Sequence, residues 1–159
     1  MSTPAGPAWS AGRPTSPILI VEDDTDIRTM MAVLLETQGY AAVVASDGIE
    51  ALSMARNLKP CLILLDLMMP VMDGPTFRHA QWQDPTISEI PVIILSAHPQ
   101  ASGIARELQA VSYLEKPVSF DALLQTVHNV CETLTKGRAS DARDPQRLTS
   151  LVARQYQSS

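Results

Sequence analysis

The sequence predicts a doubly wound α/β domain, in which helices cover both faces of a five-stranded parallel sheet. Three observations support this prediction. Short apolar runs of strand length alternate with segments whose apolar residues recur at helical spacing. Two of the runs, 18–21 and 61–65, are unbroken, which is typical of strands buried on both faces of a parallel sheet. Both runs end at carboxylates, and ligands bind at the carboxyl edge of such sheets.

The first two strands and their helices are predicted from residues 17–60. The run 18–21 ends at Glu22, Asp23 and Asp24, and the apolar spacing then becomes helical, with Asp24 or Thr25 as the cap and Gly39 at the end. A second short strand covers 41–45, and a helix follows the turn at 46–48. The apolar residues of the two helices are Ile27, Met30, Met31, Leu34, Leu35, Ala51, Leu52 and Ala55.

The stretch from Cys61 to Gly74 holds the central strand and its single carboxylate, Asp66. Gly74 and Pro75 open the next helix, because proline suits a first turn. The apolar face of that helix is thin, and it comprises Phe77, Ala80 and Trp82.

The last third of the domain repeats the alternation. The strand 91–95 ends at Ser96, a helix runs through 101–108, and the strand 112–114 ends at Glu115, Lys116 and Pro117. Ser119 caps the last helix. Its apolar stripe consists of Phe120, Leu123, Leu124, Val127, Val130, Cys131 and Leu134.

Composition limits the function classes. The chain has 159 residues, 45% of them hydrophobic, which suits one domain with a core. A formal net charge of -5 without basic clusters argues against a nucleic-acid partner. No apolar run approaches a membrane span and no signal peptide is evident, so we expect a cytoplasmic protein without a membrane contact. Cys61 and Cys131 lie in separate apolar patterns, so we expect buried thiols and find little support for a disulfide or a metal pair.

The ends of the chain differ from its middle. Residues 1–16 are rich in Pro, Gly, Ala and Ser, and we expect a flexible tail. Residues 17–135 form the predicted domain. Residues 136–159 are expected to be a second tail, with a short docking helix at 145–156 as the alternative. This tail is too short for a DNA-binding output domain, so a stand-alone domain is expected.

Four motifs in order, ILIVEDD, LLDLMMPVMDG, VIILSA and YLEKP, resemble the receiver domain of bacterial two-component response regulators. The resemblance covers about residues 17–135 and implies the strand order 2-1-3-4-5. It also implies a phosphorelay switch rather than a turnover enzyme. Such a switch takes a phosphoryl group from a sensor histidine kinase or a phosphotransfer protein and then contacts a downstream protein. The resemblance implies that Asp66 is the phosphoacceptor and that Glu22 and Asp23 are the acidic pair of the family. Ser96 occupies the family's hydroxyl position, Lys116 its lysine position and Tyr113 its aromatic switch position. The resemblance also implies a cis peptide bond between Lys116 and Pro117.

The chemistry of these residues agrees with the resemblance. A carboxylate such as Asp66 can attack phosphorus, but its charge meets the charge of the phosphoryl group, so cations are needed. Glu22, Asp23 and Asp66 supply the hard oxygens that Mg²⁺ prefers, and the resemblance adds the backbone carbonyl of Met68. The metal would contact one phosphoryl oxygen, and Lys116 is suited to a second. The third can accept a hydrogen bond from the Ser96 hydroxyl, which completes an arrangement for phosphoryl transfer.

Three other functions are known for sheets of this general class. A metal-dependent phosphatase needs a second acid two residues after its nucleophile, where this chain has Met68. A flavodoxin-type cofactor binder needs a small polar loop after the first strand, where this chain has acids. A phosphorylation-independent binding module with the same fold is the main alternative, and the intact set of site residues argues against it.

Two departures from the family pattern concern the fourth helix. The interval from Ser96 to Lys116 is slightly short, and residues 109–112 replace a turn that usually contains glycine. We therefore expect a short or irregular fourth helix. The thin apolar cover of residues 99–109 makes it the softest element, and we expect the signal to leave through the fourth helix, fifth strand and fifth helix.

Overall fold

The computed structural model describes the backbone of residues 14–140 and the side chains of residues 14–134. Most of the expected N-terminal tail and the alternative helix at 145–156 lie outside the described residues. Within them, strands and helices alternate as predicted. The elements are β1 (Ile18–Val21), α1 (Thr25–Thr37), β2 (Ala42–Ala45), α2 (Gly48–Leu58), β3 (Leu62–Asp66), α3 (Gly74–Trp82), β4 (Val92–Ser96), α4 (Ala101–Glu107), β5 (Ser112–Glu115) and α5 (Phe120–Ser140).

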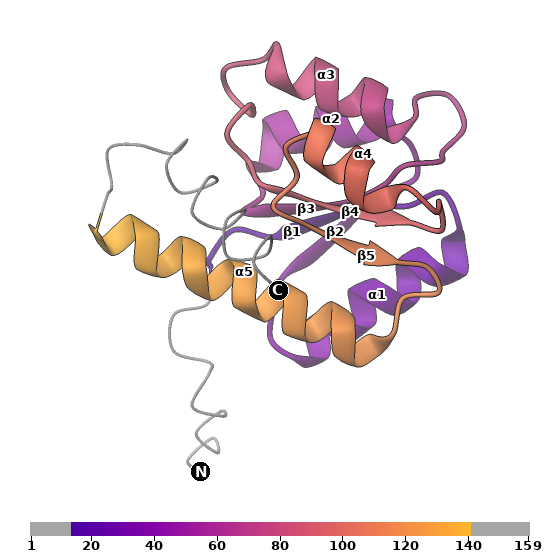
Figure 1. The fold of residues 1–159 in the computed structure, drawn as a ribbon. Helices are drawn as coiled ribbons and strands as arrows, with labels where there is room; N and C mark the ends of the chain where they lie inside the picture. Colours follow the sequence, from indigo (N-terminus) through magenta and orange to yellow (C-terminus); the bar gives the residue numbers. More distant parts are fainter. Residues whose placement is uncertain (1–13, 141–159) are drawn as a thin grey trace.

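All the strand pairs are parallel, and the sheet order is β2-β1-β3-β4-β5, which confirms the predicted doubly wound fold. The helices α1 and α5 cover one face of the sheet, and α2, α3 and α4 cover the other (Figure 1). Because β3 lies in the middle, with β1 and β4 beside it, the end of β3 is flanked by two other strand ends.

The core consists of two clusters, one on each face of the sheet. Alternate residues of β3 divide between them: Leu62 and Leu64 pack under α1 and α5, whereas Ile63 and Leu65 pack under α2 and α3. This division explains why the apolar runs are unbroken, since both faces of the inner strands are covered. Every residue of β1, β3 and β4 is buried.

Aspartates begin three of the helices. The side chain of Asp24 accepts from the backbone N–H of Ile27 at the start of α1, which decides between the two predicted caps. Asp47 and Asp73 cap α2 and α3 in the same way. The helix α4 has no side-chain cap at Gln100 and is only 7 residues long, as expected for a short fourth helix.

The helix α3 buries polar side chains that its sequence did not indicate. Arg78 is 3% exposed, and its guanidinium donates to the carbonyls of Leu108 (2.9 Å) and Gln109 (3.1 Å), where α4 ends. It also donates to Oε1 of Gln81 (2.8 Å) and lies over the Trp82 ring. Burial lowers the pKa of Arg78 to about 10, and the guanidinium remains charged at neutral pH. The thin apolar face of α3 is therefore completed by a buried, bonded cation.

Two local expectations need correction or explanation. Phe120, predicted in the buried stripe of the last helix, is 48% exposed because it is the first residue of α5 and lies beyond the edge of the cluster. The turn that lacks the usual glycine adopts a positive φ at Gln109 (53°) instead. The Arg78 bond to the Gln109 carbonyl supports that conformation, which is unfavourable for most side chains.

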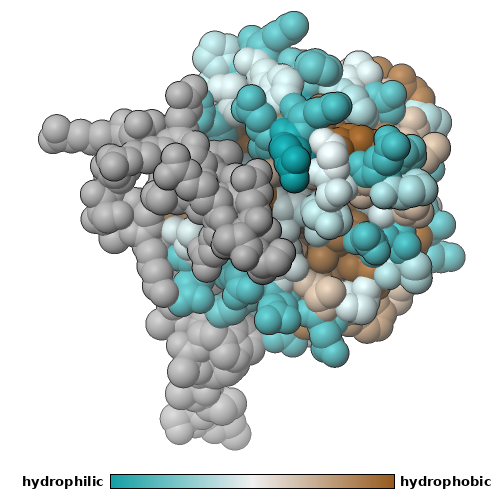
Figure 2. All heavy atoms as spheres, viewed as in Figure 1, coloured by the Kyte–Doolittle hydropathy of each residue, from teal (hydrophilic) through white to brown (hydrophobic). Residues whose placement is uncertain are grey.

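The described surface is largely hydrophilic in the view of Figure 2, with small apolar areas between polar side chains. Among the described residues, no helix is both long and apolar enough to span a bilayer.

Replacing Arg78 by alanine should lower the free energy of unfolding by about 2–4 kcal/mol, because two backbone carbonyls and the Gln81 amide oxygen would lose a buried donor. Urea denaturation measures this loss. Arg106→Ala is the matched control, since Arg106 is exposed on the neighbouring helix and should change stability by under about 0.5 kcal/mol. Equal effects of the two substitutions would contradict a structural role for the Arg78 network.

Candidate functional site

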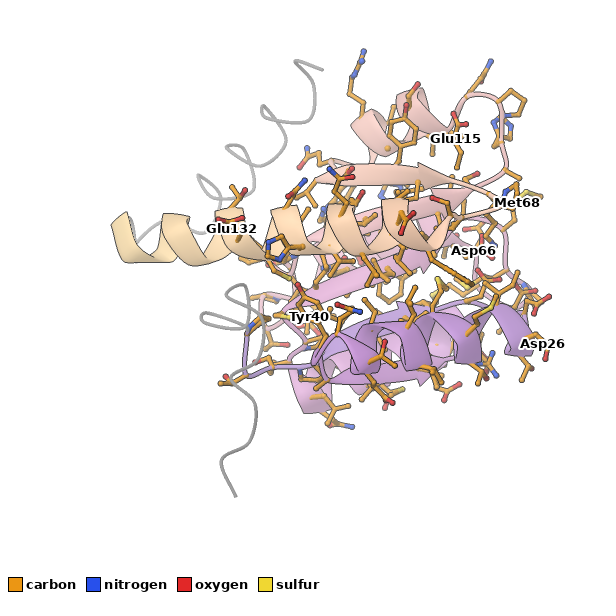
Figure 3. All side chains as sticks on the ribbon, turned by 90° about the horizontal axis from the view of Figure 1, so that it is seen from below. Asp26, Tyr40, Asp66, Met68, Glu115 and Glu132 are labelled. Carbon is orange, nitrogen blue, oxygen red and sulfur yellow. The ribbon has the colours of Figure 1, made fainter. Side chains whose placement is uncertain are left out.

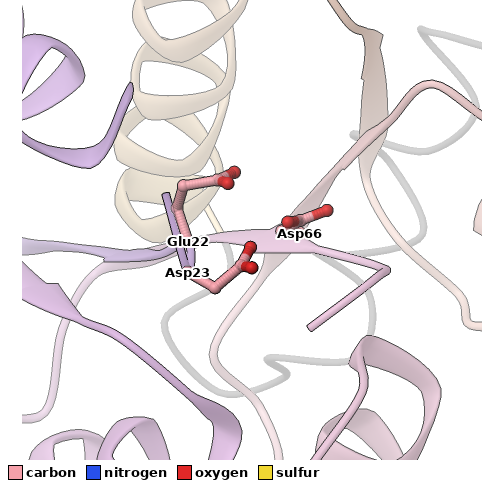
Figure 4. A group of neighbouring side chains, drawn as sticks. All are labelled: Glu22, Asp23 and Asp66. Atoms are coloured by element: carbon pink, nitrogen blue, oxygen red, sulfur yellow. The ribbon is translucent and has the colours of Figure 1, made fainter. Parts of the chain in front are cut away.

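The register of the sheet brings the predicted acids together. Val21 pairs with Leu65, so Glu22 follows β1 at the level where Asp66 ends β3. Figure 3 shows Asp66 and Met68 at the end of the molecule opposite Tyr40. In the close-up of Figure 4, the carboxylates of Glu22, Asp23 and Asp66 converge. The carboxyl edge of the sheet is thus where the sequence-predicted acids meet.

The three acids form a compact cluster of hard oxygen atoms. One oxygen from each of Glu22, Asp23 and Asp66 lies within 4.8 Å of the others. Glu22 and Asp66 are buried, at 1% and 3% exposure, whereas Asp23 is exposed. A buried pair of carboxylates with an exposed third fits a divalent cation that keeps some of its waters, as Mg²⁺ does.

A single ammonium group links the two buried acids. Nζ of Lys116 lies 2.7 Å from Oε2 of Glu22 and 3.1 Å from Oδ2 of Asp66. The lysine follows Glu115, which pairs with Ser96 in the sheet, and its backbone N–H donates to the Ser96 carbonyl. The Lys116–Pro117 bond is cis, as predicted.

Burial makes the carboxylate charges unfavourable. It raises the pKa of Glu22 and of Asp66, and the hydrogen bonds and charge of Lys116 offset only part of that rise. Burial alone would lower the pKa of Lys116, but its bond to Glu22 and the charge of Asp66 raise that pKa overall, so the lysine stays an ammonium. The site therefore holds more buried negative charge than its lysine neutralises, which favours binding of a further cation.

Arg28 is a site neighbour that sequence analysis did not assign. Its Nη1 donates to the backbone carbonyls of Glu22 (2.8 Å) and Asp23 (3.4 Å). Arg28 lies one turn into α1, so its side chain reaches back over the loop that carries both acids. This contact holds the loop against the helix. Spacing alone could not identify it, because arginines on exposed helix faces are common.

The loop after Asp66 is closely packed. The backbone N–H of Met68 donates to Oδ1 of Asp66 (3.2 Å), and the N–H of Gly74 donates to the Leu67 carbonyl. A Cβ at Gly74 would lie 2.8 Å from Cα of Leu67 and 2.9 Å from the Asp66 carbonyl, so only glycine allows this approach. The Met68 side chain is 73% exposed, and the Met68 carbonyl stays a predicted metal ligand.

The remaining predicted residues lie on the β4 and β5 side of the site. Ser96 is buried at the end of β4, and its Oγ accepts from the backbone N–H of His98 (2.9 Å). Tyr113 pairs with Ile94 in the sheet and is 39% exposed. Ser96 is thus beside the acids through the β3–β4 pairing, whereas Tyr113 lies further from them on the outer strand.

The protein is thus an α/β domain whose parallel sheet gathers three acids, a serine and a lysine at its carboxyl edge. The family model of the response regulator receiver domain matches residues 18–128, and this chain belongs to that family.

Relatives and solved structures agree with this assignment. The chain is 36% identical to the sensor histidine kinase TmoS of Ectopseudomonas mendocina, covering 77% of this chain and 13% of the kinase. It is 37% identical to the DNA-binding dual master transcriptional regulator RpaA of a Synechocystis strain, covering 69% of this chain and 46% of the regulator. The structure of the chemotaxis protein CheY4 of Vibrio cholerae aligns with a TM-score of 0.67 at 30% identity, covering 73% of this chain and 98% of that one.

The chain therefore spans half or less of the length of these two curated relatives. One of them carries a DNA-binding name, so they give no support to the expectation that nucleic acid is excluded as a partner. They do support phosphorelay signalling as the general role of the domain.

Mg²⁺ should stabilise the protein against heat, because a cation that binds only the folded state raises the free energy of unfolding by about 2.7 kcal/mol at a hundredfold excess over its Kd. Asp23→Asn should remove most of this effect, since Asp23 supplies one oxygen of the cluster. Asp26→Asn is the control: it changes the charge by the same amount on the nearby first turn of α1, outside the cluster. Calorimetric scans with and without Mg²⁺ measure the shifts, and equal loss in both variants would contradict a site at Asp23.

Proposed function

We propose that Asp66 accepts a phosphoryl group in a two-component phosphorelay. The observation that supports this proposal most directly is the position of the Asp66 carboxylate. It lies at the end of the central strand, 3.1 Å from the Lys116 ammonium and within the acidic cluster. Membership of the receiver family supports the same role.

The transfer itself requires little of the protein beyond position and charge. One oxygen of Asp66 forms the new bond to phosphorus as the bond from phosphorus to the donor nitrogen breaks, and the donor histidine, which carries a proton on its other ring nitrogen, leaves as neutral imidazole. The Met68 N–H holds Oδ1 of Asp66 by a hydrogen bond, while Lys116 contacts Oδ2. The carboxylate is therefore held in one orientation before the donor arrives.

Charge on the transferred group is met by the residues around it. Lys116, now shared between Glu22 and Asp66, can follow a phosphoryl oxygen by a small movement of Nζ. The Ser96 hydroxyl lies on the neighbouring strand and donates to another oxygen. Glu22, Asp23, Asp66 and the Met68 carbonyl would hold Mg²⁺, which would neutralise part of the developing charge when bound. Because the acyl phosphate product is labile to water, the site would reset slowly.

The partners that we propose follow from the family. The donor is a sensor histidine kinase or a histidine phosphotransfer protein, and the output is contact with a downstream protein. Residues 17–135 are proposed to act as the receiver domain, and this chain is proposed to be a signalling switch rather than a turnover enzyme. If the protein takes up no phosphoryl group, the alternative of a binding module that acts without phosphorylation would be favoured.

Signal output is proposed to involve Ser96 and Tyr113. A phosphoryl group at Asp66 would draw the Ser96 hydroxyl toward it, and space would open on the β5 side for the Tyr113 ring. The changed conformation would already be populated at a low level before phosphorylation. The phosphoryl group would raise that population only as far as it interacts more favourably with the changed conformation than with the original one. The face made by α4, β5 and α5 would then present a different surface.

Acetyl phosphate with Mg²⁺ should add one phosphoryl group to the protein, and Asp66→Asn should abolish the addition, because an amide oxygen is a poor nucleophile. Intact mass measured soon after mixing checks this prediction. Asp73→Asn is the matched control, since Asp73 caps α3 in the same loop and lies outside the acidic cluster. Undiminished incorporation in the Asp66 variant would overturn the assignment, and a chelator should prevent incorporation in the wild type.

Beryllofluoride, a phosphoryl mimic, should change hydrogen exchange over residues 99–125, which include α4, β5 and the start of α5. The physical reason is the short, uncapped α4, whose backbone bonds open more easily than those of the buried strands. Residues 25–45 serve as the internal reference and should show little change. Changes limited to 66–75 and Ser96 would rule out this output face.

A further inference from the structure

The loop between β1 and α1 carries two of the three acids of the cluster. It consists of residues 22–24, between the last residue of β1 and the first residue of α1. Glu22 is held at two points, because its backbone N–H donates to the Ala45 carbonyl (3.2 Å) and its carboxylate contacts Lys116. Asp23 is exposed, so its carboxylate is directed by the backbone of this loop more than by packing.

The Arg28 guanidinium spans this loop. Its Nη1 donates to the carbonyls of Glu22 (2.8 Å) and Asp23 (3.4 Å), and its Nη2 donates to the Thr25 hydroxyl (3.4 Å). The backbone of Arg28 is itself fixed, since its N–H donates to the carbonyl of Asp24 (2.9 Å), the cap of α1. A planar guanidinium with several donors suits such a set of acceptors, and an ammonium would reach fewer of them. The side chain therefore ties the loop to the first turn of α1.

The charge of Arg28 and its hydrogen bonds act on a magnesium site in opposite directions. Like charges repel, so a guanidinium beside the cluster disfavours a divalent cation there. The hydrogen bonds favour the cation, because a loop that is already held loses less conformational freedom when its carboxylates take up the metal. They engage two carbonyls and a hydroxyl, so the carboxylate oxygens stay available to the metal. The sign of the change in Mg²⁺ affinity without Arg28 therefore shows which effect is larger.

We propose that Arg28 is a positioning residue of the magnesium site, which keeps the carboxylates of Glu22 and Asp23 directed toward Asp66 before the metal binds. This role rests on the Mg²⁺ site proposed above and does not depend on which donor supplies the phosphoryl group. Groups that orient metal ligands without touching the metal contribute strongly, since their loss typically lowers metal affinity about 10–100-fold. Arg28 orients its two ligands through their backbone, and this effect outweighs the repulsion by its charge.

Isothermal titration calorimetry of the full chain with MgCl₂ tests this role. The Kd for Mg²⁺ should rise about tenfold in Arg28→Met, which removes the hydrogen bonds and the charge but keeps an unbranched side chain. Arg28→Lys should give an intermediate Kd, and because it keeps the charge, its rise reflects lost geometry. Arg106→Met is the control, since it removes an exposed arginine from α4 and should leave the Kd unchanged. An unchanged or lower Kd in Arg28→Met would overturn the role of Arg28, whereas a wild type that binds no Mg²⁺ would overturn the metal site and this role with it.

The rate of phosphorylation by acetyl phosphate supplies a second measurement. In Arg28→Met, the Mg²⁺ concentration that gives half the maximal rate should rise as the Kd does. The rate at saturating Mg²⁺ should change little, because the bound metal restores the positions that Arg28 otherwise holds. Thermal unfolding without Mg²⁺ shows whether each variant is folded, and Arg28→Lys carries both tests if Arg28→Met is unfolded. A rate that falls equally at every Mg²⁺ concentration would contradict a role in positioning the metal ligands.

Discussion

The contact between the Lys116 ammonium and two buried carboxylates is the interaction on which the rest of the site depends. Glu22 and Asp66 lie in a region that excludes water, and each raises the free energy of the other's charge. Removing the lysine would leave two uncompensated buried charges, which is among the most unfavourable arrangements in a protein interior. The sheet makes the contact possible, because three strand ends meet at one edge and the lysine reaches it from a fourth.

Much of this site was predictable from sequence because two simple patterns coincide there. Unbroken apolar runs identified β1 and β3 as inner strands, and parallel strands place their carboxyl ends together. The acids and Ser96 each follow a predicted inner strand and Lys116 follows the brief strand 112–114, so their convergence did not require knowledge of any side-chain contact. Asp24 illustrates the limit of the method, since only the structure could distinguish it from Thr25 as the helix cap.

The features that could not be predicted all depend on contacts between distant segments. The apolar spacing of α3 gave no indication of Arg78, which is buried because two carbonyls at the end of α4 accept its hydrogen bonds. Phe120 fits the apolar spacing of α5 but lies where no partner element covers it. The cysteines belong to different elements, and only the packing of α5 on the sheet brings both to one apolar cluster. Local periodicity carries no information about any of these partners.

The bonds from Arg78 have a mechanical consequence for α4. They hold the carboxyl end of that helix to α3, while its amino end, at Gln100, lacks a side-chain cap and follows directly on the loop that leaves Ser96. The carboxyl end of the helix is thus attached to α3, whereas its first turn, which begins at the buried Ala101, is the part nearer in sequence to Ser96. A displacement at Ser96 would therefore move the first turn of α4 more than its last turn.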